Sequence, residues 1–256
     1  MTDPAALLAA IEQAALQAGE VILEIYETDF DVDRKADNSP VTEADVKAEA
    51  VILDALLALT PDIPIVAEEE AAAGKTPTIG DAFWLVDPLD GTREFLNRNG
   101  EFTVNIALVR NGNPVLGVVH APARDVTYTG IVGDGAAIRD GGGPPEAIAV
   151  RTPPETGLTI ASSRRHGSDA DLERFLGDYT VADRIICGSS LKFCLVAAGD
   201  ADLYPRFGPT MEWDTAAGHA VLAAAGGRLT TIDGDAFVYG KPDFRNPGFI
   251  AWGTLR

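Results

Sequence analysis

The pattern of apolar residues changes at one glycine- and proline-rich segment, residues 140–145, and this change constrains the fold of the chain more than any other feature. Before the segment, two helix-like stretches precede β-type runs joined by short turns, which predicts an antiparallel meander. After it, strands and helices alternate, as is typical of an α/β arrangement. We therefore predict an α+β half at residues 1–145 and an α/β half at residues 146–256, with a ligand site in the crevice between them.

Apolar spacing defines the expected elements of each half. Helices are expected over residues 5–26 and 42–59, where apolar side chains recur every three or four positions. The expected strands of the first half are residues 83–86, 102–109, 115–121 and 126–132. In the second half, the expected strands are residues 159–161, 184–187 and 202–204, and the expected helices are residues 169–176, 190–198 and 214–225. The expected strand at residues 83–86 ends abruptly at Asp87 and Pro88.

The net charge of the chain is −19, from 39 acidic and 20 basic residues among 256. Nucleic acids and anionic membranes are repelled by such a charge, so we expect no nucleic-acid partner. No uninterrupted apolar run reaches the roughly 18 residues that cross a bilayer, and the acidic start lacks the basic region of a secretory signal. We therefore expect a cytoplasmic protein without an integral membrane segment, in which Cys187 and Cys194 are buried and reduced.

The segment Asp-Pro-Leu-Asp-Gly-Thr, residues 87–92, directly follows a predicted buried strand. Two carboxylates three residues apart, in a turn that Pro88 makes rigid, can share a hard cation. Gly91 allows the backbone to approach an oxyanion, and a helix that starts there directs free N–H groups toward the same spot. Considered alone, the segment fits equally well a turn in which Asp87 or Asp90 is an ordinary helix N-cap.

Three further acidic residues lie at comparable positions elsewhere in the chain. Glu68 ends an apolar run, Asp214 opens a predicted helix, and Asp45 follows Thr42 at the spacing of a capping box. Each has a purely structural alternative, because Glu68 fits a solvated charge run and Asp214 fits a helix N-cap. If these residues converge on the segment 87–92, they form a cation site.

Four segments together resemble the motifs of the inositol monophosphatase superfamily, whose members are lithium-sensitive, magnesium-dependent phosphatases. In chain order they are Val41-Thr42-Glu43-Ala44-Asp45, Ala67-Glu68-Glu69, Trp84 to Thr92, and Trp213-Asp214-Thr215-Ala216-Ala217-Gly218. They occur in the order that the family has and span most of the chain. The resemblance implies the layered α-β-α-β-α sugar-phosphatase fold, with α+β and α/β halves.

Two segments of the second half are similar to one branch of that superfamily, the bacterial CysQ-like 3′(2′),5′-bisphosphate nucleotidases. They are residues 188–194 and 202–213. This resemblance implies hydrolysis of 3′-phosphoadenosine 5′-phosphate, a by-product of sulfate assimilation, to AMP and phosphate by a metal-activated water. The partner is then a small phosphorylated nucleotide, and the protein is a monomer or a homodimer.

A fold of this kind allows two alternative functions: a phosphatase with another substrate, and a sensor without catalysis. The metal motifs equally fit an inositol monophosphatase or a broader sugar-phosphate phosphatase. A non-catalytic metal or nucleotide sensor on the same fold would lack a metal ligand or a water-activating residue, and the sequence retains all of them.

The resemblance implies two or three Mg²⁺ ions as cofactors. The implied ligands are Glu68, Asp87, the carbonyl of Leu89, Asp90 and Asp214. Asp45 and Thr92 are implied to orient and deprotonate the attacking water, with assistance from Glu68. The backbone of Gly91 and Thr92 is implied to bind phosphate oxygens.

The nucleotide end of the substrate is assigned to basic and hydroxyl side chains. Lys192 and Arg206 would offset the charge of the phosphate that does not react. The other substrate-binding candidates are Ser163, His166, Ser190 and Lys35. His166 and Lys35 also fit ordinary exposed surface residues, and Tyr204 fits either stacking on the base or packing in the core.

Overall fold

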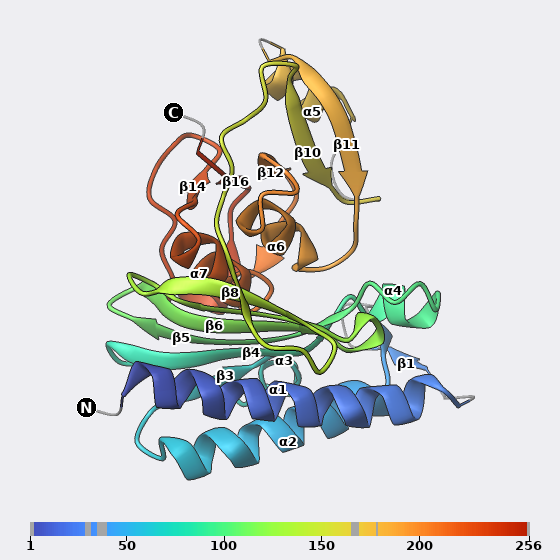
Figure 1. Cartoon of the computed structure of the whole chain (residues 1–256). Helices are drawn as coiled ribbons and strands as arrows, with labels where there is room; N and C mark the ends of the chain where they lie inside the picture. Colours follow the sequence, from blue (N-terminus) through green and yellow to red (C-terminus); the bar gives the residue numbers. More distant parts are fainter. Residues whose placement is uncertain (1–2, 29–31, 35–39, 165–168, 178, 255–256) are drawn as a thin grey trace.

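A computed structural model of the chain describes residues 3–28, 32–34, 40–164, 169–177 and 179–254. Helices and sheets alternate in five layers (Figure 1). Helices α1 (Pro4–Tyr26) and α2 (Glu43–Leu59) cover one face of a seven-stranded sheet. Helices α6 (Leu191–Ala197) and α7 (Ala216–Ala224) lie between this sheet and a five-stranded sheet, and α5 (Asp169–Leu176) covers the far side. The predicted α-β-α-β-α layering is therefore confirmed.

The seven-stranded sheet keeps its strands in chain order. They are β3 (Ile65–Ala67), β4 (Ala82–Asp90), β5 (Thr103–Arg110), β6 (Asn113–Ala121), β7 (Val126–Ile131), β8 (Gly135–Asp140) and β9 (Glu146–Ile148). All neighbouring pairs are antiparallel except β3 with β4, which confirms the predicted meander. Strands β8 and β9 were not predicted. Because β9 pairs with β8, the sheet extends to Ile148, and the division into residues 1–145 and 146–256 stays a prediction.

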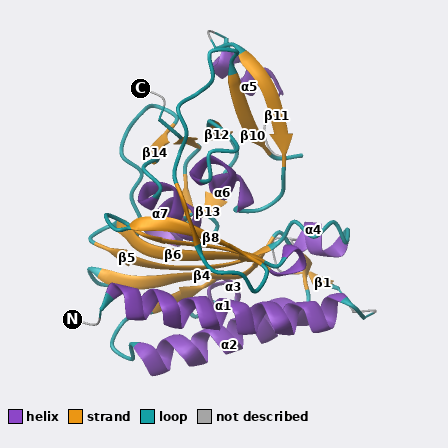
Figure 2. Ribbon diagram, in the orientation of Figure 1, coloured by secondary structure: helices purple, strands orange, loops and turns teal. Residues whose placement is uncertain are grey.

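The five-stranded sheet mixes parallel and antiparallel pairs, in the order β11-β10-β12-β16-β14. Figure 2 shows strands β10, β11, β12 and β14 above helices α6 and α7. Its strands are β10 (Leu158–Ser162), β11 (Val181–Ile186), β12 (Leu203–Arg206), β14 (Arg228–Thr231) and β16 (Phe249–Trp252). The short elements are β1 (Asp33–Arg34), β2 (Pro40–Val41), α3 (Glu68–Ala72), α4 (Thr92–Leu96), η1 (Pro122–Arg124), β13 (Thr210–Met211), η2 (Pro242–Phe244) and β15 (Arg245–Asn246). The strands after α7 were not predicted.

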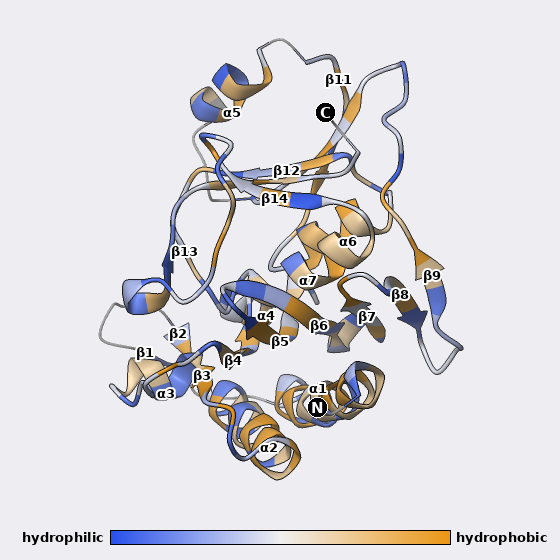
Figure 3. Ribbon diagram, turned by 90° about the vertical axis from the view of Figure 1, so that its left-hand side faces the viewer, coloured by the Kyte–Doolittle hydropathy of each residue, from blue (hydrophilic) through white to orange (hydrophobic). Residues whose placement is uncertain are grey.

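Helix α1 is, among the described residues, the one helix whose length and apolar composition would allow it to cross a membrane. Its apolar face is nevertheless used inside the protein, where Leu7, Ile11 and Ile22 are buried in the core between the helices and the sheet. Figure 3 shows that α1 and α2 also carry hydrophilic residues, as expected of helices with one solvent-facing side. We interpret α1 as a core helix.

The layer of α6 and α7 packs closely on the seven-stranded sheet. A Cβ atom added to Gly117 of β6 would lie 2.9 Å from the carbonyl oxygen of Ala217, and one added to Gly130 of β7 would lie 2.8 Å from the Cα of Val221. The backbone of α7 therefore rests directly on the sheet, which fixes the chain that leads into α7. Cys187 and Cys194 are free and buried in the same core, as predicted.

Candidate active site

Asp87 and Asp90 lie at a bulge near the end of β4. The strand continues through Asp90, and its register with β5 shifts between the two aspartates. The predicted end of the strand at Asp87-Pro88 is therefore wrong. Proline lacks an N–H donor and is tolerated in a strand where a bulge interrupts the ladder, and the bulge redirects the neighbouring side chains. The Asp87 carboxylate is buried and accepts a hydrogen bond from the Leu89 N–H at 3.1 Å.

Glu68, Asp87 and Asp214 come together from three places in the chain. Their candidate ligand atoms all lie within 4.8 Å of one another. Glu68 is the first residue of α3, and Asp214 lies in the turn before α7. Helix α7 begins at Ala216 with Thr215 as its N-cap, so Asp214 neither opens the helix nor caps it. Its carboxylate instead accepts the Met211 N–H at 2.8 Å. This oxygen-rich cluster is of the kind that suits a hard divalent cation.

Burial and mutual repulsion raise the pKa of two carboxyl groups at this site, Asp214 and Asp90. Burial raises the pKa of Asp214 well above its ordinary value, and the charges of Asp90 and Glu68 raise it further. Burial likewise raises the pKa of Asp90 to about 6, although the charge of Lys192 and the Ser190 N–H at 2.6 Å favour the ionised form. A bound cation is a large local positive charge and would remove this repulsion, so the donor set fits a metal.

Asp45 belongs to a helix cap and also contacts Thr92 of the segment 87–92. Its Oδ2 accepts the backbone N–H and the hydroxyl of Thr42, each at 2.8 Å, so the predicted capping box is present. Its Oδ1 accepts the Thr92 hydroxyl at 3.2 Å. A hydroxyl that donates to a carboxylate keeps its lone pairs for a further donor such as water. The carbonyl of Leu89 lies 3.5 Å from the same hydroxyl.

Glu49 fixes the start of the helix that carries Glu68, and the sequence analysis missed it. Its carboxylate accepts the N–H groups of Glu69 and Glu70 at 2.8 and 3.0 Å, which caps the N-terminus of α3. Burial raises its pKa to about 7. One signal was available, because Glu49 lies beside Ala48 and Ile52 of the predicted apolar face of this helix, where an acidic residue needs a partner.

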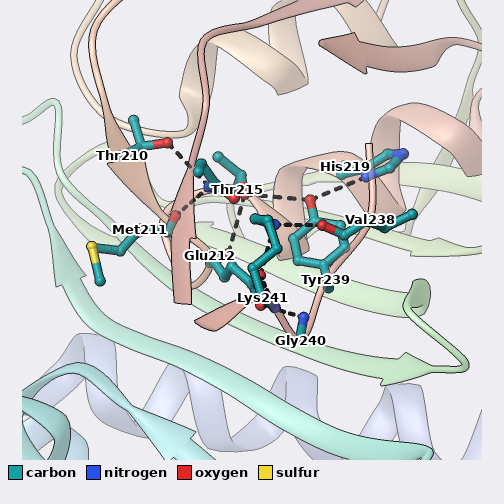
Figure 4. Close-up of polar contacts among 10 residues, drawn as sticks. Thr210, Met211, Glu212, Thr215, His219, Val238, Tyr239, Gly240 and Lys241 are labelled. Carbon is teal, nitrogen blue, oxygen red and sulfur yellow. Dashed lines mark hydrogen bonds and ion pairs between the residues drawn. The ribbon is translucent and has the colours of Figure 1, made fainter. Parts of the chain in front are cut away.

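The segment that carries Asp214 is held by a buried polar network (Figure 4). The Glu212 carboxylate accepts the N–H groups of Gly240 and Lys241 at 2.7 and 2.9 Å and pairs with the Lys241 ammonium at 2.7 Å. The Thr215 hydroxyl donates to the Glu212 carbonyl at 3.1 Å and accepts the Tyr239 hydroxyl at 3.3 Å. These bonds on both sides of Asp214 limit its movement. The pairing of residues 212 and 241 was not predicted.

One cavity of about 300 Å³ joins the acidic cluster to the second half of the chain. The predicted site residues that line it are Glu68, Asp90, Gly91, Thr92, Ser163, Ser190, Lys192, Arg206 and Asp214. Lys35 and His166 lie outside the described residues. The structure therefore brings the described part of the predicted site together. Asp45 contacts the cavity-lining residue Thr92, and Asp87 belongs to the same carboxylate cluster as Glu68 and Asp214.

Lys192 lies in the wall of the cavity and is almost wholly buried. Its ammonium donates to the carbonyl of Cys187 at 3.1 Å and to that of Ser189, and it lies 5.2 Å from the ring centroid of Tyr204. Burial lowers its pKa to about 8, against the effect of the Asp90 charge. Tyr204 packs edge-on against Phe193, which supports its alternative role as a core residue.

Two more candidates are held by neighbouring polar groups. The Ser190 hydroxyl donates to the Asn105 side-chain oxygen at 2.7 Å and lies 2.8 Å from the Thr103 hydroxyl. The Arg206 guanidinium lies within 3.4 Å of the carbonyls of Gly208 and Pro209, which orients it at the cavity.

Comparison with known proteins agrees with this fold and site. The model of the inositol monophosphatase family matches residues 3–251, and the chain belongs to this family. Enzymes of the family depend on metal ions, for which the carboxylate cluster supplies suitable donors.

Two curated relatives are each named 3′(2′),5′-bisphosphate nucleotidase CysQ. The protein from Escherichia coli (strain K12) is 48% identical over 242 residues, which are 93% of this chain and 96% of the relative. The protein from Salmonella typhimurium is 46% identical over 248 residues, which are 95% of this chain and 98% of the relative. Among solved structures, CysQ from Bacteroides thetaiotaomicron, described as a bacterial member of the inositol monophosphatase family, has a TM-score of 0.83 and 39% identity over 98% of both chains.

The raised pKa of Asp90 predicts an unusual effect on stability. The folded protein binds this proton more tightly than the unfolded chain does, so the free energy of unfolding falls as the pH rises from about 4 to about 6. We expect Asp90→Asn to stabilise the protein by about 2 kcal/mol at pH 7.5 without divalent ions, and to have no such effect below pH 4. Urea denaturation in the presence of a chelator measures this.

The control is Asp134→Asn at an exposed turn, which should change the free energy of unfolding by less than about 0.5 kcal/mol. A lower free energy of unfolding for Asp90→Asn than for the unsubstituted protein at pH 7.5 would contradict the prediction, because it would show that the fold does not disfavour the ionised form of Asp90.

Proposed function

We propose that the chain is a Mg²⁺-dependent phosphomonoesterase that hydrolyses 3′-phosphoadenosine 5′-phosphate, a 3′(2′),5′-bisphosphate nucleotide, to AMP and phosphate. The observation that carries this proposal is the distribution of charge within one cavity, where the cluster of Glu68 and Asp214 shares a wall with Lys192 and Arg206. A substrate with two phosphates matches a cavity with both a cation-binding and a basic region. The names of the two curated relatives support the same substrate class.

The metal ions would be held by oxygen donors of this chain. We assign Glu68, Asp87, the Leu89 carbonyl, Asp90 and Asp214 to two or three Mg²⁺ ions. When bound, such ions supply the positive charge that draws in a phosphate and stabilises the charge that develops on its oxygens. The raised pKa values of Asp90 and Asp214 support a bound cation, because burial and the charges of neighbouring carboxylates disfavour their ionised forms when no cation is present.

The chain's own residues would orient the attacking water. Thr92 donates its proton to Asp45, so the Thr92 oxygen is available to accept a hydrogen bond from water. Asp45 is fixed by its two bonds to Thr42 and therefore holds the Thr92 hydroxyl in one rotamer. The backbone of Gly91 and Thr92, which lines the cavity, would hold oxygens of the reacting phosphate.

We expect the enzyme to act in the cytoplasm as a monomer or a homodimer, and to be inhibited by lithium, as the family resemblance implies. None of these three properties affects the assignment of the substrate.

A substrate panel tests the proposed function. With Mg²⁺ present, kcat/KM for 3′-phosphoadenosine 5′-phosphate should exceed that for inositol 1-phosphate by about 100-fold, because the second phosphate gains charge-assisted contacts. Phosphate release under steady-state conditions is the measurement. Equal values for the two substrates would instead indicate a broad sugar-phosphate phosphatase, and no turnover with binding retained would indicate a sensor.

The Thr92 hydroxyl gives a second prediction. Thr92→Val keeps the shape of the side chain and removes the hydroxyl, so kcat should fall by about 100- to 10,000-fold while KM changes little. Thr92→Ser restores the hydroxyl and should stay within about tenfold of the unchanged enzyme. The role assigned to Thr92 is wrong if the valine variant keeps its kcat.

A further inference from the structure

Glu101 collects several hydrogen-bond donors at the wall of the cavity. It precedes β5, is 8% exposed, and accepts the Gly188 N–H at 2.8 Å. Arg164 donates to both carboxylate oxygens, with Nη2 2.9 Å from Oε1. Arg124 donates to Oε1 at 2.9 Å. Two guanidinium groups thus share one carboxylate, which leaves the cluster of Glu101, Arg124 and Arg164 with a net charge of +1.

The two arginines differ in their access to the cavity. Arg164 lines the cavity, and its side chain is 39% exposed. Arg124 has a similar exposure of 42%, but it comes from η1 and is not among the lining residues. A guanidinium has five N–H donors, and the two that Arg164 gives to Glu101 fix its plane. Arg164 therefore presents an oriented cation to any ligand in the cavity.

Glu101 also fixes the loop that continues the cavity wall. It accepts the Gly188 N–H, while Asp90 accepts the Ser190 N–H at 2.6 Å. Between them Ser189 has a φ of +45°, a strained conformation that the two carboxylates hold in place. A Cβ at Gly188 would lie 2.8 Å from the Glu101 carbonyl oxygen, so the two backbones touch. The position of Arg164 is thereby linked to the position of Asp90.

The ammonium of Lys192 is used differently. It donates to the carbonyls of Cys187 and Ser189, so it stabilises the same loop from its buried side. The Arg164 guanidinium is more exposed and better placed to contact a ligand phosphate directly.

We infer that Arg164, held by Glu101, binds the phosphate of the nucleotide that does not react and so determines the preference for bisphosphate over monophosphate substrates. This inference rests on the proposed function. An arginine fixed in advance by a carboxylate loses little side-chain entropy when it binds a phosphate, and its remaining N–H groups can donate to the phosphate oxygens. Glu101 is the positioning residue of this subsite.

The test compares two substrates that share the reacting ester. Adenosine 3′-phosphate lacks the second phosphate of 3′-phosphoadenosine 5′-phosphate. For Arg164→Ala we expect KM for the bisphosphate to rise about 10- to 100-fold with kcat nearly unchanged, and the kinetics with adenosine 3′-phosphate to stay the same. Glu101→Gln should shift KM in the same direction by a smaller factor, because Arg164 loses its charged anchor.

Arg124→Ala is the matched control. It removes the other guanidinium from Glu101 without removing a cation that lines the cavity. The ratio of kcat/KM for the two substrates should therefore not change. Thermal unfolding of all three variants checks that each is folded. Calorimetric binding of AMP gives a reading that does not depend on turnover of the variant. The dissociation constant of AMP should rise for Arg164→Ala by a factor that agrees with the rise in KM to within about threefold.

The outcomes separate the inference from the proposed function. The inference alone is overturned if the unsubstituted enzyme prefers the bisphosphate but Arg164→Ala lowers kcat/KM by the same factor for both substrates. A variant that keeps its KM for the bisphosphate also overturns it. An unchanged enzyme without preference for the bisphosphate overturns the proposed function.

Discussion

Repulsion between clustered, partly buried carboxylates is the interaction on which the rest of this structure depends. Glu68, Asp87 and Asp214 place their oxygens within 4.8 Å of one another, although they come from three distant parts of the chain. Ionised carboxylates at such separations in a partly buried site are costly, and both burial and neighbouring charges raise the pKa of Asp214. The fold must hold them together from outside, and it does so in three ways. Glu49 caps α3, the bulge of β4 presents Asp87, and Glu212 with Lys241 fixes the segment before α7.

The same cavity carries the opposite charge in the wall formed by the second half of the chain. Asp90 connects the two regions, because it lies at the end of β4, accepts the Ser190 N–H, and interacts with the buried ammonium of Lys192. The close approach of α7 to the seven-stranded sheet at Gly117 makes this arrangement rigid.

Much of the fold follows from patterns that are local in the sequence. Helices α1 and α2 and the meander were predicted because their apolar periodicity is strong, and the family motifs gave the layer order. The end of β4 was misplaced because a bulge depends on its pairing partner, which a local pattern does not contain. Asp214 was assigned to the helix because acidic residues commonly begin helices. The sequence analysis missed Glu49, Glu101 and Glu212, because each accepts hydrogen bonds from residues at least 20 positions away in the chain.

Calorimetric titration of Mg²⁺ into the protein tests the central claim most directly, that the fold brings these carboxylates together to hold a cation. At pH 6 the unchanged protein should bind Mg²⁺ and release protons, which appears as a heat that depends on the ionisation enthalpy of the buffer. Asp214→Asn should bind at least about tenfold more weakly, because one charged ligand of the cluster is lost. Binding with the same affinity and the same proton release in both proteins would contradict the account.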